Sequence, residues 1–358
     1  MVLNFSPFKF NKLSIQENYS KNPKAWYQIS GIINDNIQSP KVVWDIQTPV
    51  SVISEKIGVK TIQELHKGNI LIDFLIIVFA FVLFGLLWFS LATTNSLFIW
   101  IPLAFLQALV ISNLFFNLRH DVFMHRQVGG SKLSFLFGVM LSLPQMNTYT
   151  RFLRHEDHHK HVGYDLIEEH QAELDKPWKR LLCLTYIGLI LLVTGKLRDK
   201  NAPQANKGWE EPNVSRIARK KEFIFHLFWI LIIAVSMLYW PRAVITGYIL
   251  PFIIFTPVVY SLKFALQHSE TNVSNPFHAS VFIRTNFLVR ILFYFSLGDL
   301  HIIHHFFPRI PSWKLPKAAR MMNGIILSHN VPKRTIREVL VGYYLKGQPY
   351  RELWKDRM

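Results

Sequence analysis

The chain has 358 residues, of which half are hydrophobic and 18% are charged, and its formal net charge is +17. This length suits two ordinary soluble domains or one multi-pass membrane protein, and long uncharged stretches favour the membrane protein. Lysines and arginines gather near both ends and at 196–221, a placement that indicates membrane orientation and anionic headgroups rather than a nucleic-acid partner.

The first predicted element is a cytoplasmic N-terminal segment at 1–69, to which we assign no fold. Its start is polar and basic, without the apolar core of a secretory signal peptide. In the absence of a transit or retention signal, we expect the membrane to be a bacterial inner membrane.

Four apolar stretches follow that are long enough to be membrane spans. No charged residue lies between Asp73 and Arg119, and a polar patch at 93–96 divides this stretch in two. A second pair is divided only by Trp240, Pro241 and Arg242. Because a spanning helix needs about 20 apolar residues, we expect two hairpins of spans, at about 72–92, 97–118, 223–240 and 243–262. An even number of spans puts both basic ends on the cytoplasmic face, as the positive-inside rule requires.

Two shorter apolar stretches, 133–143 and 181–194, are too short for a comfortable span. We expect them to form helices that lie in the membrane interface or re-enter it. The only cysteine, Cys183, lies in the second stretch, so neither an intrachain disulfide nor a thiolate metal site is available.

Nine of the fifteen histidines lie in three clusters and one isolated position, all on the predicted cytoplasmic side. Two clusters have the spacing HxxHH, which on a helix stacks three imidazoles on one face so that they can converge. One such cluster is compatible with chance or with nonspecific metal binding, but two of them with an HxxxxH indicate a metal centre. The predicted ligands are His120, His125, His155, His158, His159, His268, His301, His304 and His305.

The pair His120 and His125 does not fit this pattern. Residues five apart lie about 140° from each other around an ideal helix, so they cannot share one face of a straight helix. Either the span frays at this point, or the two histidines address different metal ions.

Eight or nine imidazoles are too many for one ion and favour two metals with open positions for oxygen. Nitrogen ligands without thiolates are compatible with iron, although ligand counting excludes neither zinc nor copper. A carboxylate often orients the second nitrogen of a ligating imidazole. The candidates for this role are Asp121, Glu156, Asp157, Glu270 and Asp299.

The order of these motifs resembles the membrane fatty acid desaturase superfamily of non-haem di-iron enzymes, over about residues 70–320. HDVFMH matches the first histidine box, HEDHH the second, and HIIHH followed by FPRIPSWKLP the third; His268 in LQHSET stands where many members carry an additional ligand. The resemblance implies an all-helical integral membrane protein with four transmembrane helices. It also implies a cytosolic helical cap at 119–221 and 263–320 that holds two irons, and it leaves 321–358 as a basic cytoplasmic tail.

The resemblance implies an O2-dependent desaturase that introduces a double bond into a fatty acyl chain of a membrane lipid or an acyl thioester. Because no HPGG stretch of a fused cytochrome b5 is present, electrons are expected from a separate ferredoxin, cytochrome b5 or reductase. The chain departs from commoner members at Arg126-Gln127 and at Gly298-Asp299-Leu300, which leaves the substrate and the reaction outcome open.

Two alternatives remain beside the desaturase. A hydroxylase or ketolase of a carotenoid, sphingolipid or fatty acid would use the same scaffold and the same first hydrogen abstraction. A histidine-based metal transporter or sensor is the third hypothesis. It is disfavoured because a transport path places ionisable residues within the spans, and these spans are nearly free of them.

Overall fold

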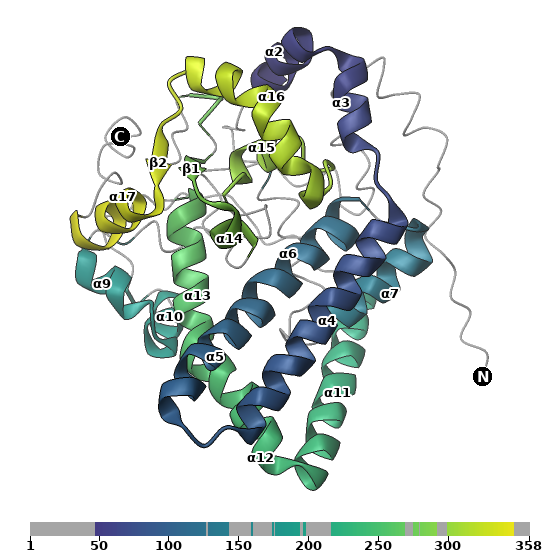
Figure 1. The fold of residues 1–358 in the computed structure, drawn as a ribbon, viewed down its shortest axis with the longest axis vertical. Helices are drawn as coiled ribbons and strands as arrows, with labels where there is room; N and C mark the ends of the chain where they lie inside the picture. The colour runs from purple at the N-terminus through teal and green to yellow at the C-terminus, as the bar shows by residue number, and fades with distance from the viewer. Residues whose placement is uncertain are drawn as a thin grey trace.

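The computed structural model describes residues 47–126, 128–142, 159, 174, 176–193, 196–197, 216–268, 275–278, 280–291 and 299–346. Within these residues the regular structure is helical except for one sheet of two strands. Long helices form one end of the molecule, and shorter helices with the sheet form the other (Figure 1). The predicted helical class is confirmed, with the small sheet as an addition that the sequence did not indicate.

Three helical stretches are long and apolar enough to cross a membrane: Ile70–Thr93, Leu97–His125 and Pro241–His268. They correspond to the first, second and fourth predicted spans. The first is α4 (Ile70–Thr93), which begins after Asn69 because the Asn69 side chain accepts hydrogen bonds from two backbone N–H groups of the first turn. Its outward residues Leu86 and Phe89 are 61% and 68% exposed, as is expected of a surface that faces lipid.

The third predicted span falls on α11 (Arg216–Tyr239), of which Leu227–Tyr239 is a shorter apolar helix. α11 ends close to the start of α12 (Pro241–Val244), at the end of the molecule far from the sheet (Figure 1). That α11 crosses the membrane, that the spans pair as two hairpins and that the opposite end is cytosolic stay predictions.

The second and third of the long apolar stretches, Leu97–His125 and Pro241–His268, both contain π-helical turns. In chain order the second stretch is α5 (Leu97–Leu109), η2 (Val110–Leu114), α6 (Phe115–Arg119) and η3 (His120–His125). In the third stretch, η6 (Ile245–Ile249) and α13 (Leu250–His268) follow α12.

These two helices continue beyond the predicted ends at 118 and 262. The cations at which the prediction stopped are accommodated by neighbouring polar groups: Arg119 donates to Ser142 Oγ at 3.1 Å, and Lys263 donates to Asn117 Oδ1 at 3.0 Å. His120, His125 and His268 therefore lie on these helices and not on loops that follow them.

The helices α4 and η6 approach each other closely where Gly247 faces Trp88. The Trp88 indole donates a hydrogen bond to the carbonyl of Ala243 at 2.6 Å, and Gln107 Nε2 donates to the carbonyl of Gly247 at 3.2 Å. Because these carbonyls lie among apolar side chains, such donors are needed to offset the loss of water.

The opposite end of the molecule is a head region, which we define as the described residues within 47–66 and 275–346. One hydrophobic core joins its early and late parts, with Ile53 and Leu65 packed among Ile303, Phe306 and Met322. Its helices are α2 (Gln47–Ile57), α3 (Val59–His66), α14 (Phe287–Val289), α15 (His301–Phe306), η8 (Ser312–Lys314), α16 (Leu315–Ser328), α17 (Ile336–Val341) and η9 (Gly342–Lys346). The parallel strands β1 (Phe282–Arg284) and β2 (Lys333–Thr335) pair with Ile283 opposite Arg334.

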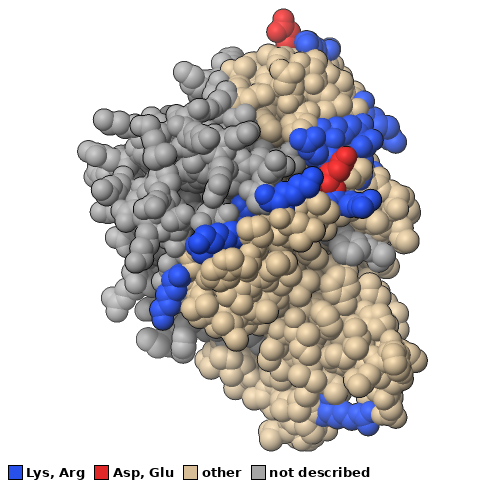
Figure 2. All heavy atoms as spheres, turned by 90° about the vertical axis from the view of Figure 1, so that its left-hand side faces the viewer, with Lys and Arg blue, Asp and Glu red and all other residues tan. Residues whose placement is uncertain are grey.

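The two shorter apolar stretches are helical. They form α7 (Gly130–Ser142) and the pair α9 (Pro177–Leu182) and α10 (Tyr186–Val193). Cys183 is fully buried against Leu174 and Leu192. On the face shown in Figure 2, lysine and arginine side chains form a band across the middle, above a broad surface that is uncharged down to a basic group at its lower end. The placement of these short helices in the membrane interface stays a prediction.

Candidate metal centre

The first histidine pair is brought together by a π-helical turn. A π-helix closes its hydrogen bonds five residues back along the chain, and here the N–H of Arg126 donates to the carbonyl of Asp121 at 3.1 Å. This turn places His120 Nε2 and His125 Nε2 only 3.3 Å apart. Both alternatives drawn from the spacing were therefore wrong: the helix does not fray, and the two imidazoles belong to one group.

That group has four members. His120, His125, His159 and His304 each offer a ring nitrogen, and these atoms lie within 4.8 Å of one another. His159 Nε2 and His304 Nε2 are 3.2 Å apart. The group thus unites one histidine from each of the second and third boxes with both histidines of the first box.

A second group consists of His268, His301 and His305, whose ring nitrogens also lie within 4.8 Å of one another. His301 Nε2 is 2.9 Å from His268 Nε2 and 3.0 Å from His305 Nε2. His268 closes α13, and the other two lie one turn apart on α15. All three side chains are buried.

The spacing of the third box predicted that its three histidines converge on one point, and the structure shows that they do not. Successive residues of an α-helix are rotated by about 100°, so His304 and His305 leave α15 in different directions. His305 joins His301, with ring centroids 4.5 Å apart, whereas His304 lies 4.5 Å from His120. The box therefore supplies two groups, and these adjoin, because the rings of His159 and His305 are only 4.6 Å apart.

The spacing of the nitrogens suits metal ions. Metal–nitrogen bonds of about 2.0–2.1 Å at tetrahedral or octahedral angles hold neighbouring ligand nitrogens about 2.8–3.4 Å apart. The closest Nε2 pairs in the two groups are separated by 2.9 to 3.3 Å. The residues present therefore fit two adjoining metal ions with nitrogen ligands, a donor set that suits iron, zinc or copper.

Five predicted site residues lie outside the described residues: His155, Glu156, Asp157, His158 and Glu270. The other two carboxylates of the prediction, Asp121 and Asp299, are buried beside the histidines. Each forms an ion pair with an arginine: Asp121 with Arg126 and Asp299 with Arg290, both at 2.5 Å. Burial raises the pKa of Asp299, and this effect outweighs the opposing influence of Arg290 and Thr285.

Sequence reasoning missed two neighbours of the histidines. Gln267 Nε2 lies 3.5 Å from His301 Nδ1, and the Gln267 carbonyl accepts a hydrogen bond from Ser280. The Phe116 ring stacks on His120 with centroids 5.9 Å apart. Gln267 directly precedes His268, and that adjacency was the one signal available for it.

A helical protein with helices apolar enough to span a membrane, and with two adjoining histidine groups at the ends of two of them, belongs to the class of membrane proteins with a histidine-rich site that can hold two metals. The comparison with protein families identifies the chain further. It belongs to the fatty acid desaturase family, whose model matches residues 98–337. No curated protein matches the chain. The matched region contains all nine predicted histidine ligands and indicates an oxidoreductase.

Proposed function

We propose that the protein is an O2-dependent di-iron lipid desaturase that introduces a double bond into a fatty acyl chain. The observation that carries the proposal is the pair of adjoining imidazole groups, buried except for the half-buried His125, within the region that matches the family. The substrate would be the acyl chain of a membrane lipid or an acyl thioester, which suits a site at the ends of apolar helices.

Each histidine group would hold one iron. His120, His125, His159 and His304 would bind the first, and His268, His301 and His305 the second, with His155 and His158 as further ligands in the set. When bound, the two irons would supply the redox chemistry that reduces O2 and removes hydrogen from an unactivated C–H bond.

The protein itself would position the ligands and keep water away from them. Ile302, Ile303, Phe306 and Phe307 surround the third box, and each is at most 3% exposed. Such a dry surrounding strengthens electrostatic interactions and suppresses side reactions with water.

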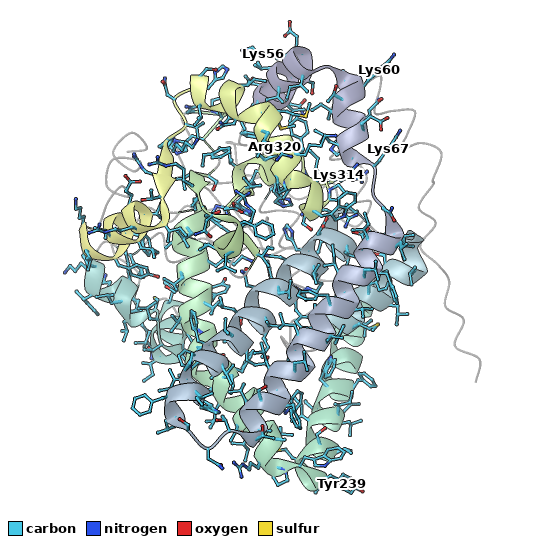
Figure 3. The ribbon with its side chains drawn as sticks, viewed as in Figure 1. Lys56, Lys60, Lys67, Tyr239, Lys314 and Arg320 are labelled. Carbon is cyan, nitrogen blue, oxygen red and sulfur yellow. The ribbon has the colours of Figure 1, made fainter. Side chains whose placement is uncertain are left out.

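Electrons would come from a separate carrier, a ferredoxin, cytochrome b5 or reductase, on the cytoplasmic side of a bacterial inner membrane. Basic side chains at the head region support an acidic carrier, since opposite charge steers association. Lys56, Lys60, Lys67, Lys314 and Arg320 lie at this end, whereas Tyr239 lies at the far end (Figure 3).

The deciding experiment expresses the full chain in a host that lacks unsaturated lipids and carotenoids, followed by mass spectrometry of the total lipids. Desaturation removes two hydrogens from a lipid species, whereas the alternative hydroxylation adds one oxygen. His304→Ala is the matched inactive control, and we expect it to lose bound iron and activity together. The purified protein should contain about two irons per chain; full activity with a single zinc would contradict the proposal.

A further inference from the structure

Each histidine group has beside it a buried carboxylate that is paired with an arginine. We propose that Asp121–Arg126 and Asp299–Arg290 are two independent clamps, each of which positions the ligands of one metal. The proposal deepens the metal centre proposed above and rests on it. It makes both arginines positioning residues, since neither is within a histidine group.

The first clamp fixes the π-helical turn that pairs His120 with His125. Asp121 and Arg126 have the same five-residue spacing as the two histidines and are each one position further along the chain. Arg126 Nε donates to Asp121 Oδ1 at 2.5 Å, and Arg126 Nη2 donates to Asp121 Oδ2 at 3.1 Å. The side-chain pair thus spans the same turn as the ligand pair and opposes its relaxation to an ordinary α-helix.

The same arginine anchors this turn to the first span. Arg126 donates to both carboxylate oxygens of Asp73, at 2.8 and 2.7 Å, and the two side chains are only 5% and 2% exposed. Burial disfavours the charge of Arg126, but Asp121 and Asp73 outweigh this effect and raise its pKa. The single positive charge of one guanidinium does not compensate two buried carboxylates, so these carboxylates need further hydrogen-bond donors.

The segment after the third box supplies those donors. The N–H of Ser312 donates to Asp121 Oδ2 at 2.9 Å, and the Trp313 indole donates to Asp73 Oδ1 at 3.2 Å. The first clamp therefore joins α4, η3 and η8, three segments that are far apart in the sequence.

The second clamp holds the start of α15 at His301, a member of the three-histidine group; His304 of the other group lies one turn further along the helix. The Asp299 side chain is fully buried, and its Oδ2 accepts hydrogen bonds from Arg290 Nε at 2.5 Å and from Thr285 Oγ1 at 3.0 Å. Thr285 follows β1 and Arg290 follows α14, so Asp299 ties both to the residue two positions before His301. The two clamps have no residue in common.

Groups that orient metal ligands typically contribute about 10–100-fold to metal affinity. We therefore expect Arg126→Gln to release the metal of the four-histidine group, and Arg290→Gln to release that of the three-histidine group, about 10–100-fold faster than the unaltered protein. The measurement is iron release from the purified, full-length protein to a chelator. Arg242→Gln, which alters an arginine bonded to Asn95 at the far end, is the matched control and should leave both rates unchanged.

Double variants identify the metal that each clamp holds. If Arg126 acts on the four-histidine metal, Arg126→Gln adds little to His125→Ala but removes the remaining iron when combined with His268→Ala. Arg290→Gln should give the reverse pattern, since changes at one site are non-additive and changes at separate sites add. Arg126→Lys, which keeps the charge but not the two-pronged geometry, should restore part of the slow release.

A milder change guards against misfolding. Trp313→Phe removes only the indole donor to Asp73 and should speed release of the same metal as Arg126→Gln, but less. Equal acceleration of both metals by either arginine variant, or no acceleration in any variant, would overturn the proposal of independent clamps. If the unaltered protein binds no pair of metals, the proposed metal centre itself fails, which is a separate and recognisable result.

Discussion

His278 is a buried histidine that belongs to neither metal group. Burial, with a smaller contribution from Arg334, lowers its pKa from 6.5 to about 4. The His278 imidazole is therefore protonated near pH 6.5 in the unfolded chain, but only near pH 4 in the folded protein. Stability from the neutral imidazole is complete above pH 6.5 and is lost as the pH falls through this window.

We expect His278→Gln to flatten this pH dependence. Between pH 6.5 and 4 the unaltered protein should lose up to about 3 kcal/mol more of its free energy of unfolding than the variant. Denaturation in detergent at several pH values measures the difference, and subtraction of the two curves cancels the titration of the metal-binding histidines. Parallel curves would show that His278 does not carry the effect.

At this scale the sequence identified much of the centre. All seven histidines of the two groups were among the predicted ligands. Helical spacing indicated those of the second and third boxes, whereas His268 was indicated by the resemblance to the family, and the spacing of His120 and His125 argued against their meeting. Their partition was not predicted, since it depends on how α15 lies between α13 and η3. Asp73 and Arg126 were missed as a pair because they are 53 positions apart in the chain.

At the scale of the helices, the chain departs from ideal α-helical periodicity at the first histidine box. The first box was misread because a spacing of five was judged by the rotation of an α-helix, whereas the chain forms a π-helical turn there. No hydropathy pattern distinguishes the two, since the extra residue is revealed by hydrogen bonds alone. The helices continue past the predicted span ends for a related reason: Arg119 and Lys263 are charged, but each has a polar partner, Ser142 and Asn117 respectively.

The contact between η6 and α4 requires a glycine. A Cβ atom on Gly247 would lie 2.2 Å from Trp88 Cδ1 and 2.9 Å from the Trp88 carbonyl oxygen, which is backbone and cannot rotate away. We expect Gly247→Val to push the helices apart and to cost about 1–3 kcal/mol or more. Thermal unfolding in detergent is the measurement.

Gly85 on the same helix α4 provides the control. Its added Cβ would meet nothing within 4 Å, so Gly85→Ala should be neutral or stabilising by up to about 1 kcal/mol through better helix propensity. If both variants were equally stable, close packing at Gly247 would not hold the two helices together.

For the molecule as a whole, the predicted topology can be tested by labelling. With Cys183→Ser as background, Thr93→Cys and Arg320→Cys place single exposed thiols at opposite ends of the molecule. An impermeant maleimide should label residue 320 only when the cytoplasmic face is accessible, and residue 93 only from the other side. Labelling of both positions from one side would contradict the proposed orientation.

Hydropathy and charge placement predicted the long helices because lipid demands about 20 apolar residues per span. The same patterns gave no indication that residues 47–66 would pack against α15 and α16, since this contact depends on long-range shape. The head region is therefore a product of tertiary packing between distant parts of the chain, and local sequence rules do not reach it.

The position of the metal ligands at the ends of the long helices has a further consequence, for the assembly and the amount of the protein in the cell. Helices that insert separately into a membrane are held together only weakly by packing. Metals bound between the second span, α13 and α15 would bind only the assembled protein and would therefore favour assembly by mass action. Cells starved of iron would then contain less of this protein as well as less of its activity, because incompletely assembled chains are degraded.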